Sequence, residues 1–154
     1  MKKWLTTICA IVLMAGVAQA KDFNAWLLGD SDSLTARLGY DITPNVEVGG
    51  EVAWLNLDEV PGNAGIYGIY KFPDAVNVPN PLPLEWLPKT LMAMPYLGMQ
   101  VGVDILNKGT FVGPIAGLVI QDIIVVEYEY LMTDFQLGQM NNEHRVSMGL
   151  CIRF

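Results

Sequence analysis

Few residues in this chain could perform chemistry. His144 is the single histidine; Glu143 precedes it and Ser147 follows three positions later. Hydrolysis requires a nucleophile within reach of a base, but residues three apart on a strand point to opposite faces, so His144 and Ser147 would not meet. Ser31 or Ser33 on a neighbouring rim is a geometrically possible nucleophile. We therefore expect no catalytic residues, with a hydrolase built from His144 and a rim serine as the alternative.

The sequence contains equally few residues suited to redox chemistry, metal binding or nucleic-acid binding. Cys151 is predicted to be an inert, inward-facing residue; a reactive thiol is the alternative, because Arg145 and Arg153 share its face. One histidine cannot supply a site of clustered His and Cys ligands. The pair Gly49-Gly50 lacks the following helix of a phosphate-binding loop. The net charge of −7 argues against nucleic acid, whose phosphates require basic patches. We expect no cofactor.

The charged residues recur instead at alternate positions. In the last segment, Arg145 and Arg153 share one face with small or polar residues, while the other face is wholly apolar. Strand side chains alternate between faces with a period of two. Similar alternation recurs at 34–42, 46–54, 97–105 and 124–132. A half-buried strand of a soluble sandwich would show the same pattern, so alternation alone predicts strands and not their surroundings.

The first twenty residues have the features of a secretory signal peptide. Lys2 and Lys3 precede a largely apolar run over 4–17, and Ala18-Gln19-Ala20 supplies a small-x-small cleavage pattern. The run is too short for a membrane-spanning helix, which needs ~20 apolar residues. We expect residues 1–20 to be cleaved and residues 21–154 to form one domain. Loss of the two lysines leaves seven basic against sixteen acidic residues, a net charge of −9.

The composition is unusual for a soluble exported protein. Hydrophobic residues make up 52% of the chain and charged residues 16%, below the ~25% typical of soluble domains. Beyond residue 20, no apolar stretch reaches the length of a spanning helix. In lipid every backbone amide must be paired internally, and a closed barrel achieves this without helices. The sequence therefore predicts an antiparallel, all-β, up-and-down transmembrane barrel.

About eight strands are predicted, mostly of ~10 residues, as in the smallest bacterial barrels. Turns are expected at Thr43-Pro44-Asn45 and at Asn107-Lys108-Gly109. Pro114 lies inside a strand, and the turn at 121–122 lacks glycine and proline. The proline-rich stretch 73–90 is expected to be a long connection without regular structure, so either one strand pair is miscounted or this stretch folds over the barrel mouth. The predicted strands are 23–29, 33–42, 46–56, 64–72, 91–106, 110–120, 123–133 and 144–154.

The C-terminal residues carry a resemblance to a known class. Val146, Met148, Leu150, Ile152 and Phe154 alternate up to a terminal phenylalanine, the signal that barrel families present to the insertion machinery. With the signal peptide, the 33–54 block and the strand pattern, the chain resembles the small OmpA/OmpX-type outer-membrane barrels. The resemblance implies a place in the cell outer membrane. It also implies lipid, lipopolysaccharide and the barrel-assembly machinery as partners.

The resemblance implies a barrel just wide enough for side chains to fill. Buried charges must be paired, so we expect a salt-bridged interior. Outward aromatic residues suit a belt at the headgroup level, with core packing as the alternative. The predicted interior charges are Arg37, Asp41, Glu47, Glu51, Lys71, Asp104, Glu127, Glu129, Arg145 and Arg153, and the predicted belt is Tyr40, Trp54, Tyr70, Tyr128 and Tyr130.

Three functions remain open at this point. The first is a structural or surface-interaction barrel without chemistry of its own, whose exposed loops at 57–63 and 134–143 are rich in polar and small residues. The second is a narrow, porin-like pore or channel subunit, suggested by inward glycines at 98, 102, 113 and 117. Relief of crowding is the other explanation for these glycines. The third is a lipid A-modifying enzyme of the outer membrane.

Overall fold

The structure is a computed structural model that describes residues 22–55, 61–80, 90–106, 108–135 and 139–154. The expected signal peptide, 1–20, lies outside these residues. All of the regular structure is β-strand, and no helix among the described residues is long and apolar enough to cross a membrane. The strands are β1 (Phe23–Gly29), β2 (Ser33–Thr43), β3 (Val46–Leu55), β4 (Asn63–Lys71), β5 (Val76–Pro79), β6 (Thr90–Asp104), β7 (Gly109–Ile120), β8 (Ile124–Phe135) and β9 (Gln139–Arg153).

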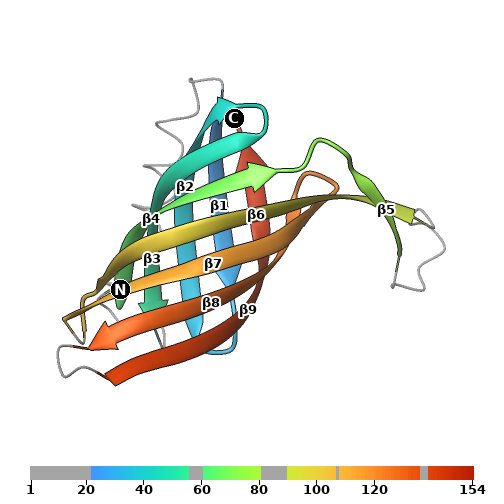
Figure 1. The fold of residues 1–154 in the computed structure, drawn as a ribbon. Helices are drawn as coiled ribbons and strands as arrows, with labels where there is room; N and C mark the ends of the chain where they lie inside the picture. The colour runs from blue at the N-terminus through green and yellow to red at the C-terminus, as the bar shows by residue number, and fades with distance from the viewer. Residues whose placement is uncertain (1–21, 56–60, 81–89, 107, 136–138) are drawn as a thin grey trace, which may run out of the picture.

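Eight of these strands form a closed barrel in which each strand pairs antiparallel with its neighbours along the chain (Figure 1). β4 pairs with β6 on one side, and β1 pairs with β9 to join the first and last strands. The predicted all-β, antiparallel, up-and-down barrel is therefore confirmed. The start of β1, the end of β9, the short β2–β3 and β7–β8 turns and the β4–β6 connection lie at one end of the barrel. We call this the terminal end, and the other end the loop end.

The stretch 73–90 differs from the prediction of a connection without regular structure. β5 pairs antiparallel with the first residues of β6, from Val76 opposite Ala93 to Pro79 opposite Thr90. This ribbon extends away from the barrel at the right of Figure 1. The prolines obscure the strand in the sequence, but Pro79 is tolerated because β5 is an edge strand. Eight strands still make the barrel, and β5 is additional to them.

Two irregular positions have simple structural solutions. The β7–β8 turn places Gln121 and Asp122 at φ angles of 54° and 60°, so the left-handed conformation that glycine favours is adopted by two polar residues instead. Pro114 pairs with Met99 of β6, but the pairing of β7 with β8 is interrupted between Val112 and Ile115. The register is the same on both sides of the interruption, so the missing N–H of Pro114 costs ladder pairs without shifting the strand.

Candidate functional site: the barrel interior and the cleft at the loop end

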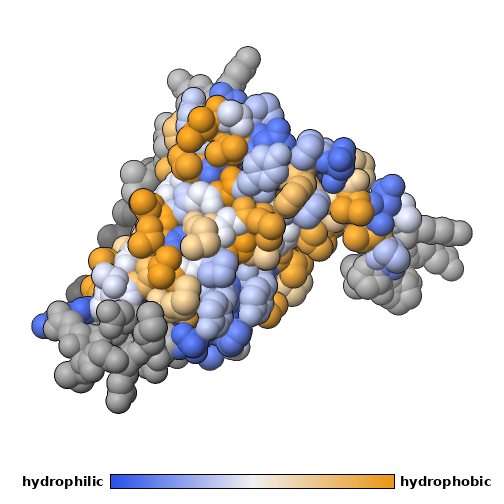
Figure 2. All heavy atoms as spheres, viewed as in Figure 1, coloured by the Kyte–Doolittle hydropathy of each residue, from blue (hydrophilic) through white to orange (hydrophobic). Residues whose placement is uncertain are grey.

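The distribution of side chains is the reverse of that in a soluble protein. The buried polar or charged residues include Arg37, Glu47, Glu51, Lys71 and Glu127, which are 0–7% exposed. Large apolar residues are exposed along the wall, for example Ile66 at 65% and Val146 at 63%. Figure 2 shows such apolar side chains spread over the visible wall, with hydrophilic groups gathered toward its ends. The polar face of nearly every strand therefore points into the barrel.

Arg37 on β2 organises the larger interior cluster. Its Nε lies 2.7 Å from Glu51 on β3, and its two terminal nitrogens lie 2.6 Å from Glu127 and Glu129 on β8. Tyr96 on β6 donates its hydroxyl to Glu127 at 2.7 Å. Because the guanidinium is planar and carries five donors, one arginine can serve three carboxylates at once. The cluster holds three acids against one base and is tied together by hydrogen bonds from strands on opposite walls.

A second cluster surrounds Glu47 on β3, which is fully buried. Its carboxylate accepts hydrogen bonds from Asn24 at 2.9 Å, Trp26 at 2.8 Å and Tyr67 at 2.5 Å. Lys71 at the end of β4 adds an ion pair of 2.7 Å. Four donors from β1 and β4 therefore replace the water that a carboxylate loses on burial.

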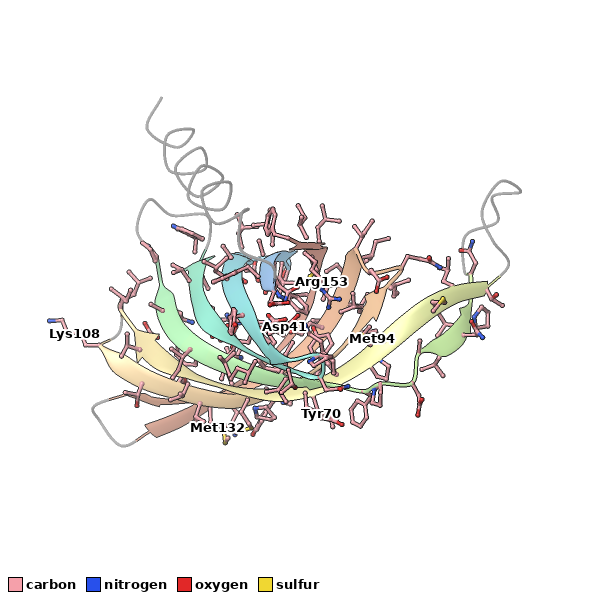
Figure 3. The ribbon with its side chains drawn as sticks, turned by 90° about the horizontal axis from the view of Figure 1, so that it is seen from above. Asp41, Tyr70, Met94, Lys108, Met132 and Arg153 are labelled. Atoms are coloured by element: carbon pink, nitrogen blue, oxygen red, sulfur yellow. The ribbon has the colours of Figure 1, made fainter. Side chains whose placement is uncertain are left out.

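Tyr67 joins the two clusters. Its hydroxyl bonds Glu47, and its ring lies beneath the Arg37 guanidinium, 5.1 Å from ring centroid to carbon. Lys71 also pairs with Asp41 at 2.7 Å, and Arg153 approaches Asp41 at 3.9 Å. Figure 3 shows Asp41 and Arg153 inside the ring of strands and Tyr70 and Met132 outside it. Arg37, Glu51, Glu127 and Glu129 thus form one group, and Asp41, Glu47, Lys71 and Arg153 form the other.

Two of the ten predicted interior residues depart from the expected setting, and one more is buried elsewhere. The Arg153 side chain is 55% exposed at the terminal end, so it belongs to the barrel mouth. Arg145 pairs with Glu143 at 2.7 Å near the loop end, and Glu143 is not one of the ten. Asp104 is buried at the end of β6 opposite Asn63. The predicted single network is therefore two clusters and a separate rim pair.

Two of the four predicted inward glycines face aromatic rings. A methyl carbon added at Gly102 would lie 2.6 Å from the Phe111 ring, and one added at Gly117 would collide with the Tyr96 ring. A buried apolar cluster including Trp26, Leu28, Ile69, Ile115 and Val125 fills more of the interior. A void of about 10 Å³ remains beside the Arg37 cluster, room for about one water molecule. Gly102 and Gly117 therefore make space for aromatic rings, whereas a methyl carbon at Gly98 or Gly113 would meet the backbone of a neighbouring strand.

The outward aromatic residues lie at two levels. At the terminal end, Tyr40 packs on Phe23 with ring centroids 5.2 Å apart, and Tyr70 packs on Phe72 at 5.4 Å. Trp54 lies near the other end of β3. Tyr128 and Tyr130 were expected near strand ends but lie in the middle of β8, because β8 and β9 continue past the level at which β1 and β2 turn.

His144 lies on the outer face of β9. Its Nδ1 is 2.6 Å from the Tyr128 hydroxyl, and its ring lies 4.8 Å from that of Tyr130. Ser147 is buried on the inner face, so the two residues are on opposite faces as expected. His144, Ser31 and Ser33 line one cleft of about 350 Å³, but His144 bonds Tyr128, and the two serines donate to Asp32 and Asp30, respectively.

The β1–β2 turn forms the other wall of this cleft. The Asp30 carboxylate accepts hydrogen bonds from the backbone of Asp32 at 2.7 Å and from the hydroxyl of Ser33 at 2.6 Å. Partial burial acts to raise the pKa of Asp30, but these bonds outweigh it and hold that pKa below its ordinary value. The turn is therefore a rigid, negatively charged edge of the cleft.

Several interior residues were not predicted as part of the site. Asn24, Trp26, Tyr67 and Tyr96 are uncharged, yet all four donate hydrogen bonds to the buried carboxylates, and the Gln100 amide lies beside Glu51 and Arg37. For Tyr67, Tyr96 and Gln100 the sequence carries a usable signal, because these residues alternate with others on a predicted inward face. Cys151 is buried on the inner face beside this group.

The fold and interior define a class: a closed, eight-stranded antiparallel barrel with a charged, packed interior and an apolar wall. Comparison with protein families, with curated proteins and with solved structures gives no match. What the protein does must therefore be argued from its own residues.

Proposed function

We propose that this chain is a small integral protein of the bacterial outer membrane, similar to the OmpA/OmpX-type barrels, with a structural or surface-interaction role and no chemistry of its own. The observation that carries the proposal is the burial of Arg37, Glu47 and Glu127 inside a wall of exposed apolar residues. Burying charge is costly in water, where these residues could face the solvent instead. The arrangement is favourable where the surroundings of the wall are lipid.

The dimensions of the wall support the same proposal. A transmembrane β-strand needs ~9–11 residues at a tilt of about 45°. The outward residues of β3 run apolar, with one glycine, from Val46 to Trp54, and those of β6 run apolar from Leu97 to Val103. The aromatic pairs at the terminal end, such as Phe23 with Tyr40, lie where amphipathic rings meet the headgroups. β3, with 10 residues, and β6, with 15, are therefore long enough to cross a bilayer core at such a tilt.

The packed interior favours a barrel without a passage over a pore. The lumen is occupied by the two charge clusters, the apolar cluster and the aromatic rings that lie over Gly102 and Gly117. The void beside Arg37 has room for about one water molecule. Export by residues 1–20 and insertion directed by Phe154 belong to the same proposal. In it, lipid, lipopolysaccharide and the barrel-assembly machinery are the partners.

The direct test is fractionation of cells expressing the full chain, with gel mobility of unboiled and boiled samples. We expect the protein in the outer-membrane fraction and a faster or slower band without boiling, because a detergent-resistant barrel migrates differently from its unfolded chain. Recovery in the soluble periplasm without detergent would overturn the proposal. Deletion of Phe154 should reduce the membrane-inserted yield, and substitution of Phe72 by alanine provides a control that removes an aromatic ring elsewhere.

A further inference from the structure

The void of about 10 Å³ beside the Arg37 cluster lies on the side of that cluster nearer the loop end. Five strands supply the side chains that carry oxygen atoms at its wall. Apolar groups, such as the Phe111 ring and the Leu131 side chain, form part of the rest. The oxygen-bearing residues are Thr35, Glu51, Asn63, Gln100 and Glu129.

One oxygen atom at this void lacks a hydrogen-bond partner. Asn63, the first residue of β4, is 6% exposed, and its side-chain Oδ1 accepts no hydrogen bond. Among the buried side-chain nitrogen and oxygen atoms that the structure describes, it is the single atom in this condition. A buried acceptor without a donor carries the full cost of its desolvation, so native proteins meet it with a protein group, a water molecule or an ion. The Asn63 oxygen therefore points to an occupant of the void.

The charge around the void distinguishes between the occupants that could fill it. The three glutamates of the Arg37 cluster share the one positive charge of that arginine, which leaves a formal excess of two negative charges. Arg145 also lines the void, but Glu143 balances its charge in an ion pair of 2.7 Å. A water molecule would satisfy Asn63 and leave the buried charge uncompensated, which is costly. Protonation of a glutamate would lower the charge and leave Asn63 without a partner, whereas a cation corrects both.

The ligands and the size of the void select the kind of cation. Oxygen atoms are the ligands of hard cations. No group of three Asp, Glu, His or Cys residues in the described part of the chain is arranged to hold a metal ion, so the void does not offer the carboxylate-rich shell of a divalent site. Thr35 and Asn63 supply neutral oxygen atoms instead. A void with room for about one water molecule admits sodium and excludes an ion as large as caesium.

We propose that the void beside Asn63 binds one sodium ion, which acts as a structural ion of the barrel interior. The Asn63 Oδ1 and the Thr35 hydroxyl oxygen are neutral ligands, and the carboxylates of Glu51 and Glu129 supply the compensating charge. The ion connects β2, β3, β4 and β8 near the loop end. The inference concerns the interior alone and does not rest on the location of the barrel in a membrane.

The test measures the stability of the full barrel refolded in zwitterionic micelles without sodium, with its folding first verified by the gel-mobility change. Urea unfolding is followed in choline, sodium and caesium chloride at equal ionic strength, so that screening is the same in all three. We expect the highest urea midpoint in sodium chloride, rising with the logarithm of its concentration, because an ion that binds only the folded state stabilises that state. Choline and caesium are too large for the void and should give one lower midpoint.

Three variants locate the effect. Asn63→Leu keeps the size of the side chain and removes the oxygen, so its midpoints in sodium and choline should be equal. In choline it should be at least as stable as the unsubstituted barrel, because it buries no unpaired acceptor. Asn77→Leu, on the exposed strand β5, is the matched control and should keep the whole sodium effect. Glu51→Gln keeps the shape and removes one negative charge, so it should weaken sodium binding by about tenfold.

The outcomes that would overturn the inference are specific to the void. Equal midpoints of the unsubstituted barrel in sodium and choline would identify water as the occupant. Equal stabilisation by sodium and caesium, or a sodium effect that survives Asn63→Leu, would place the effect outside the void. None of these results bears on the proposed membrane location, which the fractionation experiment tests by itself.

Discussion

Replacement of Arg37 by methionine is the sharpest test of the interior. The substitution keeps an unbranched side chain of similar length and removes the charge that faces Glu51, Glu127 and Glu129 at 2.6–2.7 Å. These carboxylates are 1–7% exposed, so water cannot replace the lost donors without the barrel opening. The change leaves three buried acids facing one another.

The magnitude follows from the cost of breaking a buried ion pair. Removal of one partner typically costs about 3–5 kcal/mol, because the other charge stays buried without compensation. The three acids share one arginine, so the losses are not additive, and we expect a fall of at least about 3 kcal/mol in the free energy of unfolding. Arg153→Met is the matched control: its side chain is 55% exposed and lies 3.9 Å from Asp41. It should change stability by about 0.5 kcal/mol or less.

Urea unfolding of the barrel refolded in micelles, followed by tryptophan fluorescence, measures both effects. Adding Glu51→Gln and Glu129→Gln to the Arg37→Met variant should restore part of the lost stability, since two of the uncompensated charges are removed. The reasoning is refuted if Arg37→Met and Arg153→Met unfold at the same urea concentration. It is also refuted if the two glutamine substitutions destabilise the Arg37→Met variant further.

Three further predictions concern packing, the wall and the cleft. Gly102→Leu should lower the unfolding free energy by about 1–3 kcal/mol, since its Cβ would lie 2.6 Å from an aromatic ring; a neutral result in the same urea assay would mean that the interior has room. Met148→Arg should cost about 2–4 kcal/mol in lipid, whereas Asn142→Arg, beyond the apolar band, should cost little; equal costs would contradict the placement of the band. Ser33→Ala should raise the pKa of Asp30 toward its ordinary value, measured by an NMR pH titration, because a hydrogen bond to the carboxylate is lost. In the unsubstituted protein the lowered pKa of Asp30 contributes stability that is present at neutral pH and is lost as the pH falls through the folded-state pKa. An unchanged titration would show that the backbone donors alone set that pKa.

The strands of the barrel could be predicted because their two faces differ in polarity. From Val46 to Trp54, every second side chain faces the exterior and is apolar or glycine, and Glu47 and Glu51 between them face inward. β1 showed no clean alternation, and the structure gives the reason: Trp26 and Leu28 fill the lumen while Leu27 faces outward. Where the interior itself is apolar, both faces of a strand look alike in the sequence.

The partners of the interior charges could not be predicted in the same way. Register along one strand is a local property, but Arg37 and Glu127 are 90 residues apart and meet only because the barrel closes. The uncharged donors Trp26 and Tyr67 were missed for a related reason, since a ring on an inward face is equally consistent with packing. That both rings reach Glu47 depends on how β1 and β4 are staggered relative to β3.

The interior and the loop end together limit where this protein can act. The Arg37 and Glu47 clusters connect opposite walls through side chains that are almost fully buried, so a ligand entering the lumen would have to break ion pairs that cost several kcal/mol each. Among the residues that the structure describes, β9 has no partner on its β1 side over 139–147, and β5 is paired only with β6. A barrel that is this expensive to open is suited to contacts made outside its lumen, as in the proposed structural or surface-interaction role.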